Sequence, residues 1–114
     1  MDKTAQTEAT LNHHIQAAVA GDLDGILSDY TEDSVIYSQS GPARGLAGIR
    51  EFFGEFLKNK PPGFPEDVEM LRQDVEGEVA YIVWKCGDAL PLATDTLLVR
   101  DGKIKAQTFT TFTS

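Results

Sequence analysis

Cysteine is nearly absent from the sequence, in which Cys86 is the single example. An internal disulfide therefore cannot form, and a cysteine-rich zinc cluster or a Cys-x-x-Cys redox motif is excluded as well. Nothing near Cys86 would favour a reactive thiolate, so we interpret it as a small residue of a β-strand.

Long apolar runs are missing too. No stretch approaches the roughly 20 apolar residues that span a bilayer, and no apolar run of a signal peptide follows the polar start of the chain. We therefore expect a cytoplasmic protein with no membrane partner. Basic residues are also few, since 10 lysines and arginines stand against 18 acidic residues and the net charge is −8. Nucleic-acid binding needs a basic face, so we expect no nucleic-acid partner.

Patterns that bind metals or phosphates are likewise absent. The adjacent residues His13 and His14 should diverge on a helix, and no His-x-x-x-His or clustered acidic pattern occurs. The glycine-containing stretch 41–45 lacks the lysine of a phosphate-binding loop. We therefore expect neither a metal nor a cofactor.

What the sequence does contain is the composition of an ordinary folded domain. With 41% hydrophobic and 25% charged residues in 114 positions, it predicts a single domain, residues 1–114, with a hydrophobic core of its own. Apolar residues at helical spacing predict three helices, over residues 5–20, 22–29 and 45–58.

Most of the remaining segments predict strands. Runs rich in β-branched and aromatic residues lie at 34–38, 68–75, 79–86, 93–100 and 103–112. The last two runs flank Asp101-Gly102, which is typical of a hairpin turn, whereas residues 40–42 predict a loop. This order predicts an α+β fold, in which three helices pack on a strongly curved, mostly antiparallel sheet and form a conical pocket.

Two ionisable residues are predicted to face that pocket. His14 shares the apolar face of the first helix with Leu11 and Ile15. Strand alternation puts Asp95 on the face opposite Arg100, and since Arg100 should face solvent, Asp95 should face inward. A histidine titrates near neutral pH and an apolar cavity raises the pKa of a carboxylate, so the pair could move protons. The alternatives are a His14 ring bonded to a backbone carbonyl and an Asp95 that faces solvent near a sheet edge.

Three segments of the chain, together with its last hairpin, resemble the SnoaL-like family. They are Ala20-Gly21-Asp22-Leu23-Asp24-Gly25-Ile26, Tyr30-Thr31-Glu32-Asp33-Ser34-Val35, Gly45-Leu46-Ala47-Gly48-Ile49-Arg50-Glu51-Phe52-Phe53 and Asp101-Gly102-Lys103-Ile104. That family belongs to the nuclear-transport-factor-like superfamily, which includes the ketosteroid isomerases. The resemblance implies the same fold, and an activity among isomerases, dehydratases, cyclases, epoxide hydrolases and plain binding domains.

A comparison with the isomerases assigns roles to particular positions. Those enzymes use a tyrosine on the first helix, an aspartate base on an early strand and an aspartic acid on a later strand. Counted from the matched segments, these positions correspond to His14, Ser38 and Asp95. The resemblance thus implies that this chain keeps one acid, has a different proton donor and lacks the base, which sets it apart from the steroid isomerases.

The other candidates would line the walls of the pocket. Ser38 holds the position of the missing base, and the comparison puts the face of the last strand that carries Gln107, Phe109 and Thr111 against the pocket. The aromatic candidates for the pocket wall could instead pack in the hydrophobic core. For the strand that contains Trp84, alternation does not show which face points inward. These aromatic candidates are Tyr30, Phe52, Phe56 and Trp84.

Together these observations predict a small-molecule pocket protein, with a cofactor-free isomerase, cyclase, dehydratase or hydrolase activity on a neutral apolar substrate. The alternative is a non-catalytic module of the same fold that binds a ligand or a protein. His14 and Asp95 favour the enzyme, whereas the lost base at Ser38 favours the module.

The sheet itself is predicted to pair with a second copy of the chain. Threonines alternate along the last strand, and such a row usually faces solvent or a subunit interface. Thr108, Thr110 and Phe112 share this face, where a monomer would expose the phenylalanine. The family resemblance also implies a homodimer through the sheet.

Overall fold

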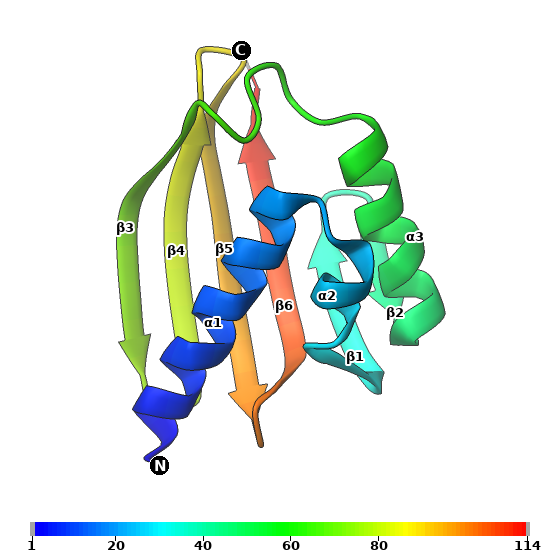
Figure 1. Ribbon diagram of the computed structural model, residues 1–114, viewed down its shortest axis with the longest axis vertical. Helices are drawn as coiled ribbons and strands as arrows, with labels where there is room; N and C mark the ends of the chain where they lie inside the picture. Colours follow the sequence, from blue (N-terminus) through cyan, green and yellow to red (C-terminus); the bar gives the residue numbers. More distant parts are fainter. Residues whose placement is uncertain (1, 114) are drawn as a thin grey trace.

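The computed structural model describes residues 2–113, which form three helices and one six-stranded sheet. In chain order the elements are α1 (Lys3–Ala20), α2 (Leu23–Leu27), β1 (Tyr30–Ser38), β2 (Gly41–Arg44), α3 (Gly45–Lys58), β3 (Val68–Glu76), β4 (Val79–Cys86), β5 (Leu90–Arg100) and β6 (Lys103–Phe112). Helix α1 packs on β3, β4 and β5, and α3 packs on β1 and β2, so the helices cover one side of the curved sheet (Figure 1). None of the helices in residues 2–113 is long and apolar enough to cross a membrane.

The strands of the sheet follow the order β2-β1-β6-β5-β4-β3. β1 and β6 run parallel, and every other neighbouring pair is antiparallel. The predicted α+β class and the mostly antiparallel, curved sheet are therefore confirmed. The parallel pairing of β1 with β6 joins the β1–β2 pair to the meander formed by β3, β4, β5 and β6.

Local signals explain the ends of the first helix. Asp2 caps α1, since its Oδ1 accepts a hydrogen bond from the backbone nitrogen of Ala5 at 2.8 Å. Gly21 ends the helix in the left-handed conformation, with φ of 70°, which favours glycine. The helix predicted over 22–29 is shorter, because β1 already begins at Tyr30 and residues 28 and 29 turn the chain into it.

Residues 41–44 correct the sequence prediction, since they form β2 and not a continuing loop. The loop predicted over 40–42 includes Pro42, and proline is unfavourable within a sheet because it donates no backbone hydrogen bond. β2 lies at the edge of the sheet, however, and pairs only with β1. An edge strand tolerates proline on its open side, which is why the sequence pattern was misleading here.

β5 lies in the middle of the β3–β6 meander and shows the predicted alternation. Asp95, Leu97 and Val99 are buried, whereas Arg100 is exposed and forms an ion pair of 2.9 Å with Glu78. The inward face of β5 therefore belongs to the core that the helices cover. The outward face, which carries Thr94 and Thr96, has no helix over it (Figure 1).

Candidate functional site

A cavity of about 80 Å³ lies between the helices and the inward face of the sheet. Helix α1 contributes His14 and α3 contributes three phenylalanines, while β3, β4, β5 and β6 supply the sheet side of the cavity. The predicted residues that line it are His14, Phe52, Phe56, Trp84, Asp95, Gln107 and Phe109. Further lining residues that the sequence did not single out are Ile15, Ala18, Val19, Phe53, Phe64, Val68, Met70 and Ile82.

Asp95 is the carboxylate of this cavity and is 6% exposed. Its Oδ1 accepts a hydrogen bond from Trp84 Nε1, and its Oδ2 accepts one from Gln107 Nε2, both at 2.9 Å. Burial raises the pKa of Asp95 to about 6, although the two hydrogen bonds act in the opposite direction. At pH 7 the group is therefore mostly a carboxylate, held by neutral donors.

Gln107 is itself held in one orientation by Tyr30. The Tyr30 hydroxyl donates a hydrogen bond of 2.5 Å to Gln107 Oε1, so the amide nitrogen of Gln107 points toward Asp95. Tyr30 is buried behind the cavity and does not line it, which corrects its predicted place as a wall residue. Burial and the nearby charge of Asp95 raise the pKa of Tyr30 well above its usual value, so its hydroxyl keeps its proton.

His14 reaches the same cavity from α1 and is also 6% exposed. Its ring meets the rings of Tyr30 and Phe53 edge-on, with centroids 6.1 and 5.7 Å away. Its Nδ1 is buried, and no hydrogen-bond partner for it lies within residues 2–113. Burial, aided by the neighbouring His13, lowers the pKa of His14 to about 4, so the imidazole is neutral at pH 7.

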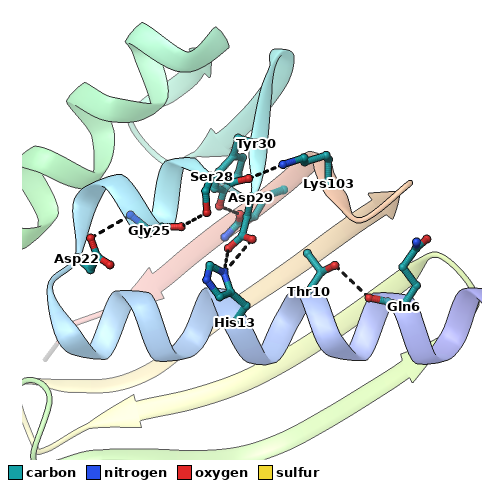
Figure 2. A network of polar contacts seen from close by, with 10 residues as sticks. Gln6, Thr10, His13, Asp22, Gly25, Ser28, Asp29, Tyr30 and Lys103 are labelled. Carbon is teal, nitrogen blue, oxygen red and sulfur yellow. Dashed lines mark hydrogen bonds and ion pairs between the residues drawn. The ribbon is translucent and has the colours of Figure 1, made fainter. Parts of the chain in front are cut away.

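His13 points away from this site, although it is the next residue along the chain. Figure 2 shows its ring directed at Asp29, and its Nδ1 lies 2.8 Å from Asp29 Oδ2. This contact ties α1 to the turn before β1, where Lys103 Nζ also donates to the carbonyl oxygen of Ser28 at 2.6 Å. No local pattern predicts this pair, because its partners lie 16 residues apart.

Ser38 and Thr111, two further predicted lining residues, do not line this cavity, although Ser38 lines a second hollow of about 520 Å³ that shares Phe52, Phe56 and Phe109 with it. Ser38 is the last residue of β1, where its Oγ accepts a hydrogen bond from the backbone of Ser40 at 3.2 Å and closes the turn into β2. Thr111 lies near the end of β6, where its backbone nitrogen donates to Gln39 Oε1 at 2.9 Å. Counting along the strands predicts that both residues line the cavity. They lie at or near the ends of their strands, however, beyond the aromatic residues that form the cavity wall.

Phe64 is the lining residue that sequence reasoning missed most clearly. It lies in the proline-rich turn between α3 and β3, outside both the helix predicted over 45–58 and the strand predicted over 68–75. Its ring packs against Phe56, with centroids 5.2 Å apart, and against Trp84 at 6.4 Å. Phe64 is the one aromatic residue among the prolines of this turn, which was the available signal.

The described residues offer no metal site beside this cavity. Nowhere in residues 2–113 do three histidine, cysteine or acidic side chains gather closely enough to hold a metal ion. What the cavity can do chemically is bind an apolar molecule against aromatic rings and present it to one carboxylate and one neutral imidazole.

Comparison with known structures shows how widely this architecture occurs. An NTF2-like protein of unknown function from Mesorhizobium loti matches with a TM-score of 0.80 and 16% identity, over 98% of this chain and 95% of that chain. A candidate ketosteroid isomerase from Kribbella flavida matches with a TM-score of 0.75 and 21% identity, over 100% of this chain and 83% of that chain. A candidate polyketide cyclase from Sinorhizobium meliloti matches with a TM-score of 0.73 and 19% identity, over 89% and 93%.

At these identities the structural likeness shows the fold, while the sequence itself shows the family. The family model of the SnoaL-like domain matches residues 11–107, which include α2, α3 and all the lining residues of the cavity except Phe109. Since that match covers most of the chain, and the folded structure agrees with NTF2-like neighbours, the protein belongs to the SnoaL-like domain family.

Proposed function

We propose that the protein is a cofactor-free enzyme that moves protons on a small, neutral, largely apolar molecule, in an isomerase, cyclase, dehydratase or hydrolase reaction. The observation that carries this proposal is that Asp95 and His14 border one aromatic cavity from opposite sides, the sheet and α1. A carboxylate with a pKa of about 6 can accept and return a proton near neutral pH. Such proton transfers require no cofactor.

The two groups would have different roles. Trp84 and Gln107 each occupy one oxygen of Asp95, which leaves further lone pairs of the carboxylate to accept a substrate proton. His14 is neutral and has one N–H and one bare nitrogen; in the tautomer with the proton on the unpartnered Nδ1, this nitrogen would donate a hydrogen bond to a substrate oxygen. Asp95 would thus act as the base, and His14 would orient the reacting oxygen.

The size of the cavity supports a small substrate. Pockets for drug-sized ligands measure about 300–1,000 Å³, whereas the space beside Asp95 and His14 measures about 80 Å³. A second hollow of about 520 Å³ shares Phe52, Phe56 and Phe109 with it, so the reacting part of the substrate is small while another part could extend into that hollow. The names of two structural neighbours, a candidate ketosteroid isomerase and a candidate polyketide cyclase, are consistent with an enzyme of this general kind.

A second candidate function is a non-catalytic module that binds a small molecule in the same cavity. The chemistry of Ser38 favours it, because this residue holds the position of the isomerase base, carries no carboxylate and lines the adjoining hollow and not the cavity of Asp95 and His14. In this case Asp95 and His14 would only orient a ligand.

Turnover measured with a matched pair of β5 variants separates the two functions. A panel of small epoxides, alcohols and cyclic ketones would be incubated with the protein in D2O and followed by NMR, which detects both new products and exchange of carbon-bound protons. Asp95→Asn should lower turnover by about 10²–10⁴-fold, while Thr96→Val, on the opposite face of the same strand, should leave turnover unchanged. Ligand binding without turnover in the wild-type protein would favour the binding module.

We also propose that the protein is a homodimer, joined through the outward face of the sheet. Strand pairing places Tyr37, Thr108, Thr96 and Tyr81 in one row across that face. Phe112 is 61% exposed there, beside the half-exposed Leu92. The row of aromatic and hydroxyl side chains and the exposed Phe112 suit contact with a second copy, whereas the charged residues of β3, beginning with Asp74 beside Tyr81, would lie at the rim.

A further inference from the structure

The described residues that line the cavity include one carboxylate and no basic side chain of lysine or arginine. Asp95 and His14 are the ionisable residues that line it, and neither a lysine nor an arginine is among the described lining residues. Tyr30, which lies behind Gln107, keeps its proton, and α3 faces the cavity only with Phe52, Phe53 and Phe56. At neutral pH the carboxylate of Asp95 is therefore the one full charge at this cavity, and no cation of the described residues lining it balances that charge.

The hydrogen-bond donors around the cavity are largely in use. The N–H of Trp84 and one N–H of Gln107 are directed at Asp95, and the hydroxyl hydrogen of Tyr30 is directed at Gln107. A ligand oxyanion would find only His14 and the second N–H of Gln107, and it would lie against a carboxylate. This is the reverse of an oxyanion hole, in which free donors converge on a developing negative charge.

The walls also favour a positive charge over a negative one. Aromatic rings present a negative face, which attracts cations and repels anions. Trp84 and Phe109 lie nearly parallel, with centroids 6.3 Å apart, and Asp95 lies on the strand between theirs. Phe56 and Phe64 extend this aromatic surface toward α3.

We infer that this cavity stabilises positive charge, so that small organic cations bind beside Asp95 in preference to neutral molecules of the same shape, and oxyanions are excluded. The inference rests on the proposed function, since it assumes that the cavity is the ligand site, and it narrows the choice of reaction. Reactions in which the reacting carbon becomes electron-poor, such as epoxide opening and dehydration, fit this site. An isomerisation through an enolate, which gathers negative charge, does not.

The test compares three small molecules that share a branched skeleton and differ in charge. Isobutylammonium, isobutanol and isobutyrate would be titrated against the protein at pH 7.5 in moderate salt. Trp84 is the only tryptophan of the chain, so the single indole N–H resonance in the NMR spectrum reports directly on the Asp95 hydrogen bond. Isobutylammonium should bind at least about tenfold more tightly than isobutanol, and isobutyrate should leave the indole resonance in place.

Two controls assign the preference to Asp95. In wild-type protein, lowering the pH to 5 protonates Asp95, whose pKa is about 6. The affinity for isobutylammonium should therefore fall toward the affinity for isobutanol. Asp95→Asn should abolish the preference while isobutanol still binds. Glu8→Gln removes the same charge from the exposed side of α1 and should change nothing, which separates the site from the general attraction of a chain with a net charge of −8.

The outcomes also separate this inference from the proposed function. Equal binding of isobutanol and isobutylammonium, tighter binding of isobutyrate, or a preference that survives both low pH and Asp95→Asn would overturn the inference while the cavity remains a ligand site. Failure of all three molecules to bind would overturn both. The low-pH measurement uses wild-type protein, so the test holds even if Asp95→Asn does not fold.

Discussion

The two faces of the sheet are made by the same strands and carry polar side chains in very different states. On the inward face, Asp95 and Gln107 are buried, and each polar atom pairs with a fixed neighbour. On the outward face, Thr96 and Thr108 lie opposite each other and have access to water. A hydroxyl in water can exchange one partner for another, whereas a buried amide or carboxylate that loses its partner pays the full desolvation penalty. Substitutions should therefore have large effects on one face and small effects on the other.

The largest expected effect is a pair of opposite pH dependences on the inward side. Burial raises the pKa of Asp95 from 3.8 to about 6 and lowers that of His14 from 6.5 to about 4. Between about pH 4 and 6 the folded protein therefore binds more protons than the unfolded chain at Asp95, and fewer at His14. As the pH rises, Asp95 lowers the free energy of unfolding and His14 raises it, each by about 3 kcal/mol, so the two contributions nearly cancel.

Single variants should expose these hidden contributions. The stability of Asp95→Asn relative to wild type should rise between pH 4 and 6, because only His14 still titrates there. The relative stability of His14→Phe should fall over the same range. Urea denaturation at a series of pH values measures both, and curves that stay parallel to wild type would contradict the assigned pKa shifts.

A smaller effect is expected from Gln107→Leu, which removes the link between Tyr30 and Asp95. The substitution leaves the Tyr30 hydroxyl and Asp95 Oδ2 without these partners, and should lower the free energy of unfolding by about 2 kcal/mol. The matched change on the outward face, Thr108→Val, should stay within about 0.5 kcal/mol. If chemical denaturation gave equal losses for the two variants, the contrast between the faces would be wrong.

Tyr30→Phe should have a smaller effect still, of about 1 kcal/mol. Without the hydroxyl, the amide of Gln107 is free to rotate, and its N–H no longer favours the ionised form of Asp95. The pKa of Asp95 should therefore rise, which the Trp84 indole resonance reports as a function of pH. An unchanged pKa would mean that Tyr30 does not orient the amide.

The smallest effect on the stability of a single chain is expected on the outward face, from Phe112→Ser. This residue is 61% exposed, so the fold of one chain should change by less than about 0.5 kcal/mol. Sizing at micromolar concentration should nevertheless shift from twice the chain mass of 12.5 kDa to that mass, because the variant removes an apolar contact between copies. A wild-type protein that is already monomeric would refute the proposed homodimer.

A feature of this structure could be predicted from the sequence when the residues that indicate it lie within one helix or strand. Alternation along β5 placed Asp95 on the buried face, and helical spacing did the same for His14, because each signal lies within one element. The hydrogen bonds that define the site are not local, since Tyr30 and Gln107 lie 77 residues apart. Nothing in the strand around Trp84 could show that its indole reaches Asp95, because apolar residues occupy both faces there.

The positions carried over from the isomerases were informative only within regular elements. His14 and Asp95 lie in the middle of a helix and a strand, where counting residues preserves direction. Ser38 and Thr111 lie at or near strand ends, where the turn into β2 and the side chain of Gln39 decide the contacts instead. The edge strand β2 was missed for a similar reason, since Pro42 is acceptable only because no strand lies on its other side.

The parallel pairing of β1 with β6 has a consequence for how the chain folds during synthesis. β1 is made early, yet its main partner in the sheet is the last strand of the described residues, with Ile36 opposite Gln107. While the ribosome makes the intervening segments, β1, β2 and α3 have no sheet on which to close, and the Tyr30–Gln107 bond cannot form. Long-range pairings of this kind slow folding, so the nascent chain exposes the aromatic face of α3 until β6 has emerged.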